Sequence, residues 1–451
     1  MLTAVLLGLL AQGAKERYQQ KIGEMSDYFW KERLRLAEWA KSSGLNREAR
    51  GLLEFMVKNI QGTHPYKTRA DTLLWGPWKR QPNSATTAKQ KEYLRRLESY
   101  YRATADRCFE AYRIAKAASM KEETVTALQK TIEFYHDHEG ARKERGEEKV
   151  DGFGWIAKAD AEFVRASCFD ADSRSVEDLE KSDGEHETWA SAWVVRSKHY
   201  VLRTDLPVRR ALAALELLEK LHAVLLEWCE GSFTEPPERM GVYFFRRLAD
   251  LEAERAKLPN TPAAVAFYHA LTNVVYVRSF DSARENGGGV GRSDQEFLLH
   301  EATHQLLDRG AEQRVVSIFQ QSNQRLDAVD NYWIVEGAAT WFSTLRFEGG
   351  EAKLGSDAWR IGAVRGLATQ GKLPTLRSFL ELSYDEFLKG SHANYAISYA
   401  LTAFLVEKYK KPFVTFLREY YLGNGSLPSF EKTVSGIDKL DREFRVWLGE
   451  K

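Results

Sequence analysis

The second half of the chain is organised around a predicted helix at residues 293–304, which read Ser293-Asp294-Gln295-Glu296-Phe297-Leu298-Leu299-His300-Glu301-Ala302-Thr303-His304. Ser293 and Glu296 have the spacing of a capping box, so we expect a helix that begins here and runs to about Gly310. On that helix His300 and His304 lie one turn apart on the same face. Two imidazoles in this arrangement can reach one metal ion.

A second apolar helix is predicted downstream, where the sequence reads Asn331-Tyr332-Trp333-Ile334-Val335-Glu336-Gly337-Ala338-Ala339-Thr340-Trp341-Phe342. Glu336 is the only carboxylate in this run. A lone carboxylate among apolar residues is costly to bury unless it is paired or bound to a metal. A catalytic zinc site needs a third protein ligand and leaves its fourth position to water, and Glu336 is the candidate for that third ligand.

The HExxH pattern at 300–304, followed by W-x-x-E-G-x-A at 333–339, resembles the glutamate zincins, the thermolysin-like and aminopeptidase-like branch of the metallopeptidases. More closely, residues 190–420 resemble the peptidase-MA-like domains of bacterial exported proteins. The resemblance implies that His300, His304 and Glu336 hold one Zn²⁺ per chain and that Glu301 is the general base of peptide-bond hydrolysis. The metzincin variant is excluded, because it needs a third His and a Gly soon after His304, and the residues that follow, Gln305-Leu306-Leu307-Asp308, do not supply them.

The run Asn394-Tyr395-Ala396-Ile397-Ser398-Tyr399-Ala400-Leu401 resembles the helix that supplies a tyrosine to the oxyanion in related peptidases. Tyr395 is the first candidate, Tyr399 the second, and His392 a third donor. Both tyrosines equally suit the buried face of an amphipathic helix.

Other polar features suggest supporting or structural roles. Asp308 and Thr340 lie one turn beyond His304 and Glu336 and are candidates to support the imidazoles, although thermolysin-like enzymes commonly carry an acid where Thr340 stands. The glycine-rich run 287–291 lacks the P-loop ending and predicts a loop. His136 and His138 predict a polar turn.

The first part of the chain, residues 18–160, has helical composition and apolar spacing. Residues 36–45 are echoed by 111–120, each followed by a second amphipathic helix, a short polar stretch (64–69 and 138–142) and a tryptophan, Trp78 or Trp155. Two helices per unit resemble a degenerate tetratricopeptide-type hairpin, although the period near 75 residues is about twice the usual one. The alternative is an irregular helical domain.

The composition changes after an acidic polar stretch. Residues 193–195 with 199–202 predict a strand, 207–228 a long helix, and 241–245 and 274–277 further strands. The predicted fold class is α+β, with an all-α region of helical-hairpin repeats before a zincin-like domain of twisted sheet, HExxH helix and C-terminal helical subdomain. The predicted domains are a signal peptide at 1–14, TPR-like repeats at 15–168, a linker at 169–188 and the zincin-like domain at 189–451.

The composition limits the class of partner. The chain has 451 residues and a formal net charge of +1, whereas a large nucleic-acid surface normally leaves a basic excess. Cys108, Cys168 and Cys229 are odd in number and widely spaced, which excludes a disulfide framework and a cysteine-based zinc site.

The N-terminal segment MLTAVLLGLL, residues 1–10, is too short to span a bilayer as a helix. With the small residues up to Ala14 it fits a signal peptide, although the positively charged residues that usually begin one are missing. The alternative is that these residues are the apolar start of a helix. We expect an exported protein of the bacterial envelope, periplasmic or extracellular, with no membrane span in the mature chain.

The sequence therefore predicts a zinc metallopeptidase that acts on a peptide or protein, with the N-terminal helices docking substrate or a protein partner and with no nucleic-acid partner. The alternative is a catalytically silent zinc-binding or interaction scaffold built on a peptidase-like fold. The intact HExxH favours the enzyme, because a decayed site is free to lose Glu301.

Overall fold

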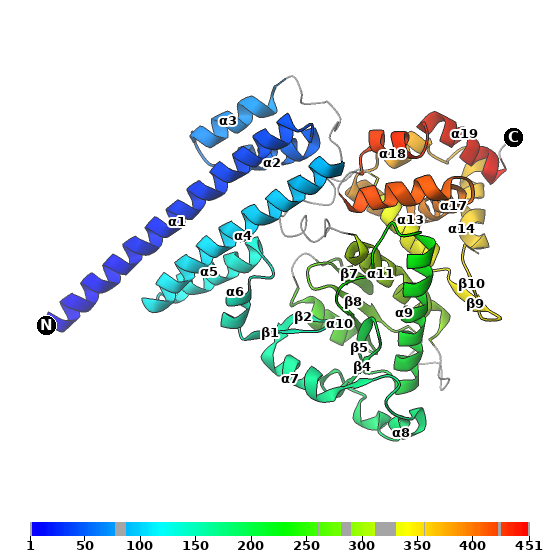
Figure 1. Ribbon diagram of the computed structural model, residues 1–451, viewed down its shortest axis with the longest axis horizontal. Helices are drawn as coiled ribbons and strands as arrows, with labels where there is room; N and C mark the ends of the chain where they lie inside the picture. The colour runs from blue at the N-terminus through cyan, green and yellow to red at the C-terminus, as the bar shows by residue number, and fades with distance from the viewer. Residues whose placement is uncertain are drawn as a thin grey trace. The chain divides into compact units, whose positions relative to one another are not determined.

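The computed structural model describes residues 2–76, 87–258, 261–280, 290–311, 331–355, 357–422 and 425–449. Contacts divide the described chain into two compact units, one within residues 2–147 and the other within residues 148–311 and 331–449 (Figure 1). In the described ranges, no helix combines the length and the apolar character needed to cross a membrane.

The described part of the first unit is helical. α1 packs on α2 and α4, and α4 packs on α5. The prediction of helix is wrong between Glu144 and Lys158, where two short strands lie, because Gly146, Gly152 and Gly154 have positive φ and interrupt the helical backbone. The helices are α1 (Leu2–Ser42), α2 (Asn46–Asn59), α3 (Pro65–Leu74), α4 (Thr87–Ala117), α5 (Lys121–Phe134) and α6 (Glu139–Glu144).

The two stretches that echo one another in sequence make the same local structure. Gly44 and Ser119 both take positive φ, 79° and 54°, and each is the second residue after the end of its helix, α1 or α4. The Leu45 N–H donates to the Ala40 carbonyl, and 75 residues later the Met120 N–H donates to the Ala115 carbonyl, each at 2.9 Å. The helix-to-helix connections are therefore alike in hydrogen bonding.

The polar stretches that follow are alike too. His64 and His138 each precede a helix, and each accepts a backbone N–H with its side chain, from Tyr66 and from Ala141. The polar turn predicted around His138 is therefore a helix N-cap. Trp78, the counterpart of Trp155 in the sequence echo, lies outside the described residues.

The second unit is built on a six-stranded mixed sheet of order β3-β4-β5-β6-β8-β7. The pairs β3–β4, β5–β6 and β6–β8 are parallel, and β4–β5 and β7–β8 are antiparallel. The single strand predicted over 193–202 is wrong: it is two antiparallel strands, because the chain turns back where the Ser197 N–H donates to the Tyr200 carbonyl. The strands are β3 (Cys168–Asp170), β4 (Trp193–Arg196), β5 (Tyr200–Thr204), β6 (Met240–Phe245), β7 (Ala266–His269) and β8 (Val274–Arg278).

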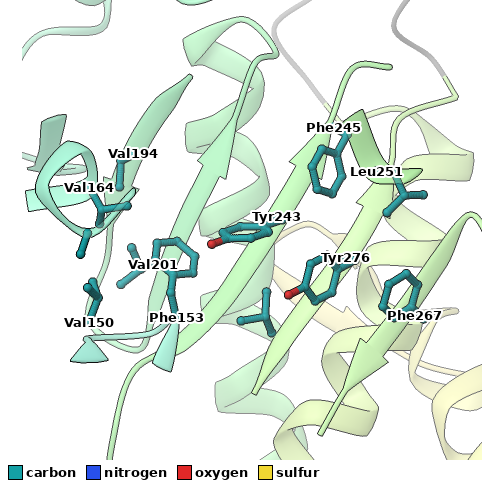
Figure 2. Close-up of a cluster of buried hydrophobic side chains, with 12 residues drawn as sticks. Val150, Phe153, Val164, Val194, Val201, Tyr243, Phe245, Leu251, Phe267 and Tyr276 are labelled. Carbon is teal, nitrogen blue, oxygen red and sulfur yellow. The ribbon is translucent and has the colours of Figure 1, made fainter. Parts of the chain in front are cut away.

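Helices cover both faces of this sheet. On one face α9 (Val208–Trp228) packs on β4 and β5 and contacts α11 (Arg292–Gly310), which packs on β7 and β8. On the other face α10 (Leu248–Arg255) packs on β6 and β8. Figure 2 shows a cluster of apolar side chains along the strands, with Tyr243 and Tyr276 near its centre. The buried side chains of the cluster are Val150, Phe153, Ala161, Val164, Val194, Val201, Tyr243, Phe245, Leu251, Phe267, Val274 and Tyr276.

The second unit begins earlier than the boundary expected at residue 168. β2 (Gly154–Ala157) pairs with β1 (Glu147–Val150), and Phe153 and Val164, the latter on α7 (Lys158–Ser167), pack in the sheet cluster. Residues 169–188 lie within this unit and hold α8 (Val176–Glu180) and a 3₁₀ turn, Asp183–Glu185. Asp183 accepts the N–H of Val208 at 2.8 Å, so this acidic stretch caps the start of α9.

Helices complete the second unit after the sheet. α17 packs on α13 and α14, and it bends at Tyr409, three residues before Pro412. The remaining elements are α13 (Trp333–Phe342), β9 (Arg346–Glu348), β10 (Glu351–Lys353), α14 (Ala358–Thr369), α15 (Leu376–Leu380), α16 (Tyr384–Lys389), α17 (Ser391–Tyr421), α18 (Leu427–Thr433) and α19 (Ile437–Leu448).

Candidate metal centre

α11 carries the HExxH motif, and it begins one residue earlier than expected. Gly291 is the N-cap and makes no side-chain cap, so the predicted capping box is wrong. Glu296 ion-pairs instead with Arg360 at 2.6 Å, on α14 of the same unit. Because the Glu296 carboxylate is held by Arg360, it does not bond to the backbone at the start of the helix, as a capping box requires.

The sheet fixes the rotation of α11 about its axis. The buried Gln305 amide donates to the carbonyl of Gly241 at 3.0 Å and to the carbonyl of Asn273 at 2.8 Å. These bonds hold one face of the helix against the sheet. His300 and His304 lie against α13 instead, where they meet Glu336.

The three predicted metal ligands converge. The His300 Nε2–Glu336 Oε2 distance is 3.2 Å, His304 Nε2–His300 Nε2 is 3.1 Å and His304 Nε2–Glu336 Oε2 is 3.6 Å. Ligand atoms about 2.0–2.1 Å from a tetrahedral zinc ion are about 3.3 Å apart, which is near the spacing of these three atoms. Two imidazoles and one carboxylate are also a donor set that suits zinc.

The electrostatics of the triad favour positive charge beside Glu336. The Glu336 side chain is 5% exposed, and although burial would raise its pKa, His304 and His300 hold the pKa well below the usual range. Burial would lower the pKa of His304, but the Glu336 carboxylate outweighs it and the pKa is raised. A buried carboxylate between two imidazoles is therefore suited to a cation.

A tyrosine that the sequence reasoning missed holds the other oxygen of Glu336. The Tyr332 hydroxyl donates to Glu336 Oε1 at 2.5 Å, while Oε2 faces the two histidines. Tyr332 and Glu336 are four residues apart on a helix, and that spacing was the available signal. Such a bond orients a carboxylate ligand.

Glu301 lies beside the triad and is held by strand β7. Its Oε2 accepts the Tyr268 N–H at 2.8 Å. Burial raises the pKa of the Glu301 carboxyl above its usual range. A raised pKa suits a general base, because proton transfer is most effective when the pKa is near the working pH.

Tyr268 was also missed from the sequence. Its hydroxyl donates to Asp308 Oδ2 at 2.8 Å, so one residue of β7 contacts both Glu301 and Asp308 on α11. Thr340 does not take the role expected of it, because its hydroxyl donates to the Glu336 carbonyl at 2.6 Å within α13.

The three candidate oxyanion donors lie in different surroundings. The Tyr395 ring centroid is 6.2 Å from that of His300, so Tyr395 is beside the triad. The Tyr399 hydroxyl accepts the Asp357 N–H at 3.0 Å, which places it at the start of α14. His392 is exposed on the first turn of α17. Of the glycine-rich run 287–291, residues 287–289 lie outside the described residues.

Gly337 lets α17 approach α13 closely enough to bring Tyr395 near His300. A Cβ on Gly337 would lie 2.4 Å from Thr402 Oγ1 and 2.9 Å from the Ser398 carbonyl oxygen. We expect Gly337→Ala to lower the free energy of unfolding by about 2 kcal/mol, because the helices must move apart. Urea denaturation measures the change.

The matched control is Gly366→Ala on α14, where a Cβ meets nothing within 4 Å. Alanine is the better helix former, so this variant should gain roughly 0.5–1 kcal/mol. Equal effects at the two glycines would contradict the close helix crossing at Gly337.

Comparison with known proteins does not add to this geometry. No protein-family model matches the chain, and no curated protein matches it at a significant level of similarity.

Proposed function

We propose that this protein is a zinc-dependent peptidase of the glutamate-zincin type that hydrolyses a bond in a peptide or protein substrate. The observation that carries the proposal is the spacing of the His300, His304 and Glu336 ligand atoms, 3.1–3.6 Å apart, with the Glu301 carboxylate beside them.

Each residue has a role in this proposal. His300, His304 and Glu336 would hold the ion, which supplies Lewis-acid activation of water and of the substrate carbonyl. Glu301 accepts the proton of the attacking water and delivers it to the leaving amine. Tyr395 donates a hydrogen bond to the carbonyl oxygen as negative charge develops on it.

The domain assignments belong to the same proposal. Residues 189–451 would form the zincin-like domain, and the TPR-like helices within 15–168 would dock substrate or a partner. The matching connections at Gly44 and Ser119 support a duplicated helical hairpin. Residues 1–14 would direct export to the cell envelope.

Peptide hydrolysis with and without metal tests the function. The purified protein should cleave an unfolded, fluorescently quenched protein substrate, lose that activity after dialysis against a chelator, and regain it with about one equivalent of Zn²⁺. Cleavage that persists through chelation would contradict a metal-dependent mechanism.

The two tyrosines on α17 give a matched pair of variants. We expect Tyr395→Phe to lower kcat by about 100-fold with little effect on zinc content, because a donor to the developing oxyanion is lost. Tyr399→Phe should leave kcat near the wild-type value and cost about 1 kcal/mol of stability, since its hydroxyl bonds the Asp357 backbone. The reverse pattern would move the oxyanion role to Tyr399.

A further inference from the structure

A second group of metal-ligand residues lies in the same unit, outside the centre described above. His199, His222 and Glu235 each offer one ligand atom, and these atoms lie within 4.8 Å of one another. His199 immediately precedes β5, His222 is on α9, and Glu235 is in the segment between α9 and β6. None of the three belongs to the proposed catalytic machinery.

The three residues line a cavity of about 320 Å³, to which Pro236 and Pro237 also contribute. The cavity is large enough to hold an ion together with water. Its prolines restrict the backbone next to Glu235.

His199 faces carboxylate oxygens with both ring nitrogens. Its Nδ1 is 2.5 Å from Glu219 Oε2, and its Nε2 is 3.0 Å from Glu235 Oε1. Glu219 is itself fixed, because its Oε1 accepts the Ser197 hydroxyl and the His199 N–H. A neutral imidazole can donate through only one nitrogen, so the other contact needs a second positive species, either a proton or a metal ion.

His222 supplies an independent observation. The residue is 5% exposed, and its Nε2 has no hydrogen-bond partner in the described part of the chain. Leaving a buried polar nitrogen unpaired is unfavourable. The ring stacks on His199 with centroids 3.7 Å apart, next to the cavity that both line.

The basic residues around the cavity do not ion-pair with Glu219 or Glu235 in the described part of the chain. Arg239 pairs with Asp151 at 2.7 Å, Lys149 pairs with Glu238, and Lys198 lines the cavity. Within the described ranges, Glu219 and Glu235 pair with no Lys or Arg, so with neutral imidazoles they place two negative charges beside the cavity. That arrangement favours a bound cation.

We propose that His199, His222 and Glu235 bind a second divalent transition-metal ion, of the zinc class, with Glu219 orienting His199. Two imidazoles and a carboxylate suit this class, and a carboxylate on the far nitrogen of a ligating histidine is a common support. Coordination follows the in-plane lone pair, so the two stacked rings, which lie at an interplanar angle of 12°, would have to open to share an ion. The cavity supplies water for the fourth position.

The ion would join three separate parts of the unit: the start of β5, α9 and the segment before β6. That segment also contacts the active-site helix, since the Thr234 N–H donates to the Gly310 carbonyl at the end of α11 at 2.9 Å. A metal ion bound here would therefore stabilise the segment around Thr234 and Glu235, which contacts the end of α11. Its role is structural, and it does not depend on the catalytic proposal.

A zinc titration of the full chain tests this site. The probe is Zn²⁺ added to metal-free protein, with bound metal measured by equilibrium dialysis, for wild type, Glu235→Gln and Glu238→Gln. Glu235 has a 58% exposed side chain, so its replacement should not prevent folding, and Glu238 is the matched carboxylate of the same segment that pairs with Lys149 instead. We expect Glu235→Gln to weaken the binding of one equivalent of zinc by at least about tenfold in Kd. Glu238→Gln should bind zinc as wild type does.

The outcome is distinguishable from failure of the catalytic centre, because the readout is the equivalent that depends on Glu235. A total of two equivalents in wild type, one of them weakened in Glu235→Gln, supports the second site whatever His300→Ala does to the other. Saturation curves that coincide for wild type and Glu235→Gln would overturn it.

Discussion

Replacing Glu301 by glutamine is expected to reduce peptide hydrolysis by about 1,000-fold while zinc content stays at the wild-type level. The substitution keeps the size of the side chain and an oxygen to accept the Tyr268 N–H, so the local structure should persist. The amide cannot take a proton from water at neutral pH. The loss should therefore be in kcat, with KM little changed.

Glu296→Gln is the matched control for Glu301→Gln. Glu296 lies on the same helix, but its carboxylate pairs with Arg360 rather than with the triad. The activity of this variant should stay within about twofold of wild type, since a partly exposed ion pair contributes about 1 kcal/mol or less to stability. Turnover retained in Glu301→Gln would contradict the general-base assignment, and zinc binding without turnover in wild type would favour the silent scaffold.

Replacing Glu336 by glutamine is expected to weaken zinc binding by at least about 100-fold and to abolish hydrolysis at limiting zinc. The substitution removes the negative charge that lies between His300 and His304, while the amide oxygen can still accept the Tyr332 hydroxyl. The fold should therefore remain while the affinity falls. Competition with a chromogenic chelator measures the change, and Glu296→Gln again serves as the control.

The contradictory result for Glu336→Gln would be wild-type zinc affinity with lost activity. That outcome would remove Glu336 from the ligand set and leave it a structural carboxylate held by Tyr332. It would leave the two histidines without the third ligand that a tetrahedral zinc site needs.

The metal-ligand residues of the candidate site could be predicted from sequence, because helical spacing and the cost of burying a charge both depend on residues close together along the chain. The HExxH spacing places two imidazoles on one helical face, and the cost of burying a lone carboxylate identified Glu336. The structure brings these three side chains together. Helix α9 was likewise predicted almost to the residue from its apolar spacing.

Contacts between distant segments account for what the sequence did not reveal. Tyr268 reaches Glu301 because β7 pairs with β8 at the sheet edge, and no local pattern encodes that pairing. The predicted capping box is wrong because the Glu296 carboxylate pairs instead with Arg360, 64 residues away along the chain. His199, His222 and Glu235 form no recognisable motif, because an antiparallel turn, a long helix and a loop bring them together.

The most direct test of the central claim is the zinc content of the purified full chain by inductively coupled plasma mass spectrometry, beside the variant His300→Ala. The proposal predicts that the variant holds one zinc equivalent fewer per chain than wild type, with an unchanged circular dichroism spectrum. Equal zinc content in the two proteins, after purification without chelators, would contradict a zinc ion held by His300, His304 and Glu336.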